Sequence, residues 1–199
     1  MEINWAELKK NYELFENLCS KIESIQADKF DSNQITNMLD ILGERLLMCP
    51  SNMKNDQPGC APGGMIKFCI SVTAKMREMA PHYGMDSNNP SILKVGLFHE
   101  IGKVGDLEND YFIEQNSDWN REKLGQYYKW NEECQKMSVS HRTLYLLQHF
   151  NVHLSQEEWL TLQLAYGMHF EENRFYNGSE PKLAMLLQDA RRIVFSDFG

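Results

Sequence analysis

Several features that define common classes of protein are missing from this chain. No run of apolar residues approaches the ~20 that a membrane-spanning helix needs, and the N-terminal segment MEINWAELKKNYELF is charged and amphipathic, unlike a signal peptide. The five cysteines are scattered and contain no C-x-x-C pair, which argues against a disulfide framework or a structural zinc site. These absences predict a protein of the cytoplasm that makes no contact with a membrane.

Common nucleotide-binding and hydrolase motifs are also missing. The chain has no G-x-x-x-x-G-K, G-x-G-x-x-G or G-x-S-x-G segment, so nothing indicates a P-loop, a Rossmann fold or a nucleophile elbow. Acidic residues outnumber basic ones by 28 to 20, and the formal net charge is −8. Because nucleic-acid backbones are bound mainly through Lys and Arg, non-specific binding of nucleic acid is not expected. A local basic pocket for a small phosphate is compatible with this charge.

What the chain does contain is a series of segments with helical periodicity. At 199 residues and 42% hydrophobic composition, residues 1–199 are expected to form one domain around one core. Apolar residues recur at helical spacing, and no segment shows the sustained alternation of a strand. We therefore predict an all-α fold. The predicted helices lie within residues 1–30, from about residue 31 to 48, from residue 65 onward, from residue 90 to about 102, at 138–150, at 155–168 and from residue 181 onward.

Two segments are predicted to be irregular. Residues 50–64 are rich in Pro, Gly and Asn and are expected to form a loop. Residues 104–136 are polar and aromatic, and both a hairpin and short helices are compatible with their sequence.

The most informative stretch is L-F-H-E-I-G-K, residues 97–103. His99 and Glu100 offer one nitrogen and one oxygen ligand to a divalent ion. Apolar residues on both sides imply that this pair is partly buried, where an unpaired charge is costly. Lys103 follows one helical turn later, which is a suitable position for contact with a phosphate.

This stretch resembles the signature of the HD superfamily of metal-dependent phosphohydrolases, which reads apolar-apolar-His-Asp-Ile-Gly-Lys. Residues 62–72 are similar to the Pro-Gly-Gly segment that opens the first core helix of several branches, and residues 119–128, 140–150 and 154–159 look like a phage-encoded branch. The resemblance covers roughly residues 40–195. It implies an HD-like helical bundle, with 1–30 as an N-terminal helix and 104–136 as an insert, and location in the host cytoplasm if the gene is carried by a phage.

The resemblance also implies a set of metal ligands, which this chain carries only in part. His99 matches the family's histidine and Glu100 stands where aspartate is usual, so these two are the predicted metal ligands. The family's first-helix histidine falls on Phe68, and its last-helix aspartate falls on Arg191. A guanidinium facing Glu100 would replace the charge of the metal with an ion pair. If Phe68 and Arg191 both lie beside His99, the usual metal site is not formed.

Several other polar residues are secondary candidates. Arg142, Lys103 and Arg191 are predicted to bind a phosphate, since Arg offers a forked set of donors. Surface positions at helix ends explain the other histidines more simply than metal binding does. An active enzyme would have to take its missing ligands from His82, His141, His169 or Asp189.

Two hypotheses follow from this set. In the first, the chain is an HD-type protein with an eroded metal site that binds a nucleotide or a protein partner with little or no catalysis, and no metal is required. In the alternative, it is an active nucleotide phosphohydrolase. His99 and Glu100 would then hold Mg²⁺ or Mn²⁺, and Glu100 and Lys103 would be its catalytic residues.

Overall fold

The computed structural model describes residues 3–26 and 33–197, and this part of the chain is mostly helical. Residues 1–2 and 27–30 of the predicted N-terminal helix, and residues 31–32 at the predicted start of the next helix, lie outside the described residues. The elements, in chain order, are α1 (Trp5–Gln26), α2 (Gln34–Met48), α3 (Gly64–Met79), α4 (Pro90–Phe98), β1 (Phe112–Glu114), α5 (Asp118–Leu124), β2 (Tyr128–Trp130), α6 (Val139–His149), α7 (Gln156–Gln163) and α8 (Lys182–Asp197). Short 3₁₀ helices span Ala80–Tyr83, Ile101–Val104 and Glu171–Tyr176.

Helices α4 and α7 begin where the sequence supplies capping groups. The Asn89 side chain accepts a hydrogen bond from the Ser91 N–H, and Pro90 occupies the first turn of α4. Ser155 and Glu158 form the reciprocal hydrogen bonds of a capping box at the start of α7. These side chains satisfy amide groups that a helix leaves without partners at its first turn.

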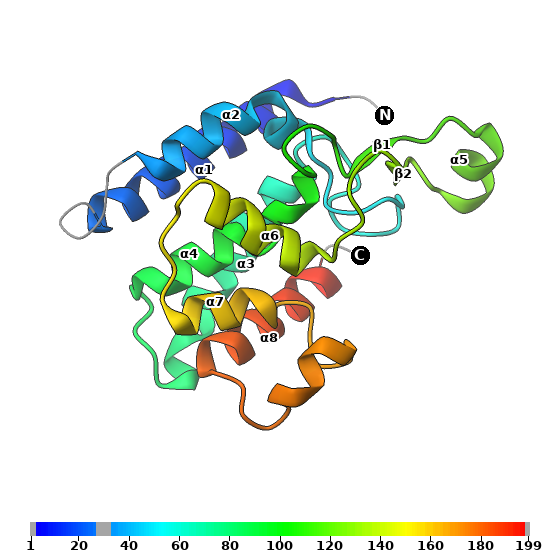
Figure 1. The fold of residues 1–199 in the computed structure, drawn as a ribbon. Coiled ribbons are helices and arrows are strands. Elements are labelled where there is room, and N and C mark those ends of the chain that lie inside the picture. The colour runs from blue at the N-terminus through cyan, green and yellow to red at the C-terminus, as the bar shows by residue number, and fades with distance from the viewer. Residues whose placement is uncertain (1–2, 27–32, 198–199) are drawn as a thin grey trace.

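Helix α3 is the central element of the bundle. It packs against both α4 and α8, while α1 pairs with α2 and also contacts α3 and α4. Figure 1 shows α1 and α2 at one end of the bundle and α7 and α8 at the other. The apolar faces of all these helices join in one core that includes Phe15, Leu42, Phe68, Leu147 and Leu187.

The α3–α4 contact is close because Gly96 lies within it. A Cβ atom at this position would come within 2.5 Å of the Thr73 Oγ1 atom and 3.1 Å of the Thr73 Cα atom. The absence of a side chain therefore allows α4 to approach the α3 backbone, and this contact determines where the residues that follow α4 are placed.

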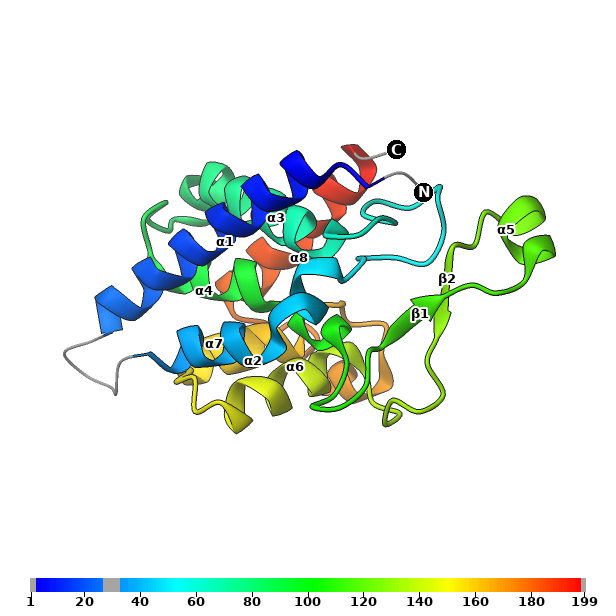
Figure 2. The ribbon, with the colours of Figure 1, turned by 90° about the horizontal axis from the view of Figure 1, so that it is seen from above.

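The segment predicted to be irregular contains both a hairpin and a short helix. Strands β1 and β2 pair antiparallel, with Phe112 opposite Trp130 and Glu114 opposite Tyr128, and α5 connects them. Figures 1 and 2 show this insert projecting from the side of the helical bundle.

Two arginines attach the base of the insert to the bundle. Arg45 of α2 forms an ion pair with Asp110 at 2.7 Å and donates to three backbone carbonyls, those of Val104, Asp106 and Leu107. Buried Arg142 of α6 donates to the carbonyls of Gly102, Gln135 and Met137. Because each guanidinium joins several carbonyls, the first and last residues of the insert are fixed while its tip extends outward.

The prediction of one helix over residues 155–168 was wrong at its end. Helix α7 stops at Gln163, and Gly167 has a φ of +100°, which continues no helix. The chain turns at this point and brings Tyr166 beside Glu100.

No helix in the described ranges is long and apolar enough to cross a membrane.

Candidate functional site

The LFHEIGK stretch lies at the end of α4, where the helix changes into a 3₁₀ turn. Helix α4 ends at Phe98, and the 3₁₀ helix of Ile101–Val104 follows after His99 and Glu100. His99 and Glu100 are exposed by only 0% and 1%. Gly102 is required at this turn, because a Cβ atom on it would come within 2.4 Å of the Val139 carbonyl oxygen in α6.

The Glu100 carboxylate is held by four side chains. Its Oε2 atom accepts from the Ser51 hydroxyl at 2.7 Å and pairs with the Lys103 ammonium at 2.9 Å. Its Oε1 atom pairs with Arg191 at 2.9 Å and accepts from the Tyr166 hydroxyl at 3.2 Å. The ion pair between Arg191 and Glu100 that the sequence predicted is therefore confirmed, and both carboxylate oxygens are occupied.

The two cations of this cluster, Lys103 and Arg191, also contact groups other than Glu100. Lys103 also donates to the Ser51 carbonyl oxygen at 2.6 Å. The Arg191 guanidinium donates to the Ala165 carbonyl at 2.9 Å and lies over the Tyr166 ring, 4.1 Å from its centroid. The Arg191 Nε atom is buried and has no hydrogen-bond partner among the described residues. One donor of this guanidinium is thus unused.

The electrostatics of the cluster keep Glu100 ionised. Burial alone would raise the pKa of its carboxyl group, but Lys103 and Arg191 outweigh that effect and hold the pKa well below its usual value. Burial and the neighbouring Glu100 carboxylate raise the pKa of Tyr166 well above its usual value, so its phenol stays protonated and donates.

His99 lies beside this cluster in its neutral form. Its Nδ1 atom is 2.8 Å from the Gly96 carbonyl oxygen, which can only accept, so Nδ1 carries the proton. Burial and then Arg191 lower the pKa of His99 to about 3. Its Nε2 atom is buried without a hydrogen-bond partner among the described residues. The Phe68 ring centroid lies 6.1 Å from that of His99.

The residues present do not fit a divalent metal ion. Lys103 and Arg191 both lie within 3 Å of the Glu100 oxygens, at 2.9 Å each, so an added cation would meet two positive charges. Phe68 offers no ligand atom. Within the described ranges, no three His, Cys, Asp or Glu residues are grouped so that they would hold a metal. Two ligands in such surroundings are too few for a stable site.

A cavity of about 390 Å³ opens beside the cluster. It lies between the residues of α3, the turn after α7, and α8. Three cations and one carboxylate line it, together with three aromatic rings and two amides: Lys103, Arg191, Arg192, Glu100, Phe68, Tyr166, Phe195, Asn52 and Gln188. The cavity is therefore locally cationic in a chain whose net charge is −8.

The structure brings together only some of the predicted site residues. Lys103 and Arg191 meet at Glu100, but Arg142 does not line the cavity. Two of its nitrogens donate to carbonyls of the insert and of Gly102, and its guanidinium lies 4.3 Å from the Tyr111 ring centroid. The contacts of Arg142 are therefore structural, and this residue lies outside the cavity lining.

The secondary metal candidates also have other partners. Asp189 accepts a hydrogen bond from the Tyr83 hydroxyl and pairs with Arg192 at 3.3 Å. The His141 Nε2 atom lies 3.2 Å from the Gln163 amide nitrogen. Neither residue contacts Glu100 through an ion pair or hydrogen bond.

Sequence reasoning missed Ser51 and the role of Tyr166. Ser51 lies in the loop of residues 50–64, where composition indicates only irregular structure, yet it is 1% exposed and binds both Glu100 and Lys103. Tyr166 stands near the position at which the family resemblance expects a further histidine, and that substitution was the available signal.

No family model matches the chain, and neither a curated protein nor a solved structure matches it.

Proposed function

We propose that this chain is an HD-type helical protein that has exchanged its metal ion for Arg191 and works by binding a phosphate group without hydrolysing it. The ligand would be a nucleotide or another phosphoester, held in the cavity beside Arg191. The observation that carries the proposal is the Glu100 carboxylate, whose two oxygens are taken by Lys103, Ser51, Arg191 and Tyr166.

The occupied carboxylate supports the loss of hydrolysis. Metal-dependent phosphohydrolases need an ion that activates a water molecule. Here Arg191 pairs with Glu100 and, together with Lys103, supplies the positive charge that neutralises this carboxylate. The bundle therefore remains stable with no ion in its centre.

The cationic cavity supports the binding of phosphate. The side chain of Arg191 is 17% exposed and lines the cavity. Arg192 lies at the rim with a side chain that is 72% exposed. An arginine offers a planar fork of donors that matches phosphate oxygens, and two adjacent arginines strengthen this preference.

The test is a calorimetric titration with pyrophosphate and with nucleoside mono- and triphosphates, at low ionic strength. We expect saturable binding without release of inorganic phosphate, and binding about fivefold weaker in Arg192→Gln, because an exposed charge contributes up to about 1 kcal/mol. Arg174→Gln is the matched control, since Arg174 is exposed and does not line the cavity. Failure of all these ligands to bind, or equal binding by both variants, would contradict the proposal.

A second candidate function has one supporting observation. The buried Nε2 atom of His99 has a free lone pair directed at no described hydrogen-bond donor, as a metal ligand would. If the chain is an active hydrolase, the same nucleotide samples incubated with Mn²⁺ will release phosphate, and His99→Ala will abolish that release. The phosphate-binding proposal predicts no release from either protein.

A further inference from the structure

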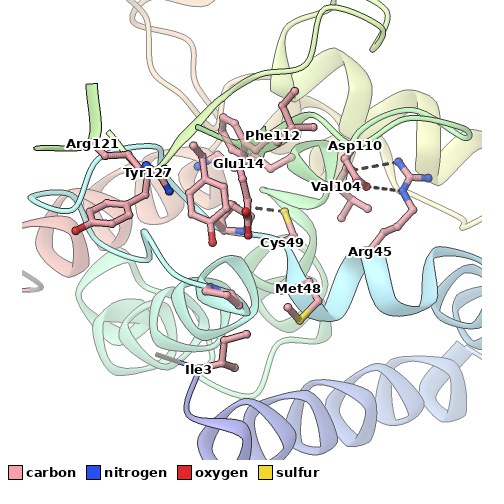
Figure 3. Close-up of a pocket in the computed structure, with 15 residues that line it drawn as sticks. Ile3, Arg45, Met48, Cys49, Val104, Asp110, Phe112, Glu114, Arg121 and Tyr127 are labelled. Atoms are coloured by element: carbon pink, nitrogen blue, oxygen red, sulfur yellow. Dashed lines mark hydrogen bonds and ion pairs between the residues drawn. The ribbon is translucent and has the colours of Figure 1, made fainter. Parts of the chain in front are cut away.

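A second cavity, of about 370 Å³, lies between the insert and the helical bundle. Its walls come from β1 and β2 on one side and from the end of α2 and the loop after it on the other. Figure 3 shows Phe112, Glu114, Tyr127 and Arg121 on the insert side of this cavity, with Met48 at the end of α2 and Cys49 directly after it on the bundle side. Lys103 borders both this cavity and the one beside Arg191. We name this second space the hairpin cavity.

The strand pairing explains why rings and a carboxylate share one wall. Glu114 is paired directly with Tyr128, and Phe112 lies two residues before Glu114 on the same strand. Alternate residues of a strand, and directly opposed residues of a pair, lie on the same face of a sheet. Phe112, Glu114 and Tyr128 therefore face the hairpin cavity together, and Tyr127 adds a further ring.

The three cations that line the hairpin cavity each contact a carboxylate. Each is paired with a carboxylate: Arg45 with Asp110 at 2.7 Å, Lys103 with Glu100 at 2.9 Å, and Arg121 with Asp118 at 2.8 Å. Glu114, by contrast, forms no ion pair or side-chain hydrogen bond with any residue that the structure describes. It is exposed, and among the charged residues that line the cavity it alone forms no ion pair with a described residue.

The hydroxyl groups of the two tyrosines add to this unused capacity. Neither Tyr127 nor Tyr128 uses its hydroxyl in a hydrogen bond within the described ranges. Burial and the nearby Cys60 and Glu114 raise the pKa of Tyr128 to about 12, so its phenol remains neutral. The hairpin cavity thus offers aromatic faces, neutral hydroxyls and one negative charge.

We propose that the hairpin cavity binds a guanidinium group, which lies against the rings of Phe112, Tyr127 and Tyr128 and donates a forked pair of hydrogen bonds to Glu114. A guanidinium is planar, stacks on aromatic faces and is weakly hydrated, so it suits these walls better than an ammonium group does. Its two parallel N–H groups match the two oxygens of a carboxylate. The group belongs either to an arginine side chain of a partner polypeptide or to a small free guanidine compound.

This inference is independent of phosphate binding beside Arg191, because its ligand carries the opposite charge and its walls come from the insert. Calorimetry with Nα-acetyl-arginine methylamide, Nα-acetyl-lysine methylamide and agmatine at low salt tests it directly. We expect the arginine amide to bind more tightly than the lysine amide. Tighter binding of the capped arginine than of agmatine assigns the site to a polypeptide, and the reverse order assigns it to a small guanidine compound.

Two variants and one control determine which charged residue of the cavity wall contributes to binding. Glu114→Gln should weaken binding of the arginine amide about fivefold, as expected for an exposed ion pair of up to about 1 kcal/mol, whereas Glu122→Gln on the neighbouring α5 should leave it unchanged. Arg121→Gln should leave binding unchanged or strengthen it, because it removes a cation from the cavity wall. Lack of binding by the arginine amide, equal binding by Glu114→Gln, or weaker binding by Arg121→Gln would overturn the proposal.

Discussion

Among the residues that the structure describes, two carboxylates are buried, and each is paired with a lysine, yet their surroundings differ. Glu158 of α7 pairs with Lys94 of α4 at 2.9 Å, and the two side chains are exposed by only 6% and 1%. Glu100 pairs with Lys103 at the same distance, but it also has Arg191 and a cavity of about 390 Å³ beside it. One pair is enclosed by protein, and the other borders a space that a ligand can enter.

The two clusters also differ in the groups that contact them. The carboxylate of Glu158 accepts from Ser91 at 2.8 Å and from the Ser155 amide at 2.8 Å, so it joins α4 to the capping box of α7. Every partner of that pair is a structural group. The Glu100 cluster has one cation more than it needs for neutrality, and that surplus borders a cavity.

The largest expected effect is the loss of stability when the enclosed pair of Lys94 and Glu158 is broken. Lys94→Met leaves the Glu158 charge without a partner in the interior and should lower the free energy of unfolding by about 4 kcal/mol, within the range for breaking a buried ion pair. Arg191→Met should cost about half as much, because Lys103 and Ser51 still bind Glu100 and water can enter from the cavity. Urea unfolding of both variants measures the two values.

A double variant provides the control for this comparison. Glu158→Gln removes the charge and retains a side chain that can form the capping box, so adding it to Lys94→Met should restore part of the lost stability. A larger loss in Arg191→Met than in Lys94→Met would show that the cluster at Glu100 is the more important for folding, and would contradict this distinction.

The next effect in size is a dependence of stability on pH at His99. Burial and Arg191 lower its pKa to about 3 from the ordinary 6.5, so between these values the unfolded chain binds a proton that the folded chain does not. Stability is then lost as the pH falls through this range. From pH 7 to pH 5 the contribution of His99 should fall by about 2 kcal/mol.

The His99→Gln variant isolates this contribution. Its free energy of unfolding should fall less than that of the unmodified protein between the same two pH values, by the amount attributed to His99. Equal decreases in the two proteins would mean that His99 becomes protonated in the folded state near its ordinary pKa.

The smallest expected effect is the loss of stability on removing a hydroxyl group that donates to one of the two buried carboxylates. Ser51 donates to Glu100 at 2.7 Å, and Ser91 donates to Glu158 at 2.8 Å. Removing either hydroxyl with Ser51→Ala or Ser91→Ala should lower the free energy of unfolding by about 1.5 kcal/mol, the value for a hydrogen bond to a charged group. A negligible loss in Ser51→Ala would show that Lys103 and Arg191 alone hold Glu100.

Local patterns in the sequence were sufficient to predict much of the fold. The capping pattern of Ser155 and Glu158 and the position of Pro90 marked the starts of α7 and α4 correctly. The end of α7 could not be predicted in the same way, because residues 164–166 have no helix-breaking side chain. There the turn depends on contacts with distant residues, such as the donation from Arg191 to the Ala165 carbonyl.

The candidate site was predictable only at positions where the sequence could be aligned with the motif of the family that it resembles. The ion pair of Arg191 with Glu100 was expected because the family resemblance places Arg191 where a metal-ligating aspartate is usual, and the two side chains do pair at 2.9 Å. The contact of Ser51 with Glu100 joins residues 49 positions apart through a loop without periodicity. Arg142 was predicted to bind phosphate from its charge alone, but it contacts backbone carbonyls and Tyr111 instead.

The central claim is that Arg191, and no metal ion, neutralises the Glu100 carboxylate. The most direct test is a calorimetric titration of chelator-treated protein with Mn²⁺, carried out in parallel on Glu100→Gln. We expect that Glu100→Gln removes no Mn²⁺ binding, because both oxygens of the Glu100 carboxylate already have partners in the unmodified protein. Stoichiometric binding of Mn²⁺ that disappears in Glu100→Gln would contradict it.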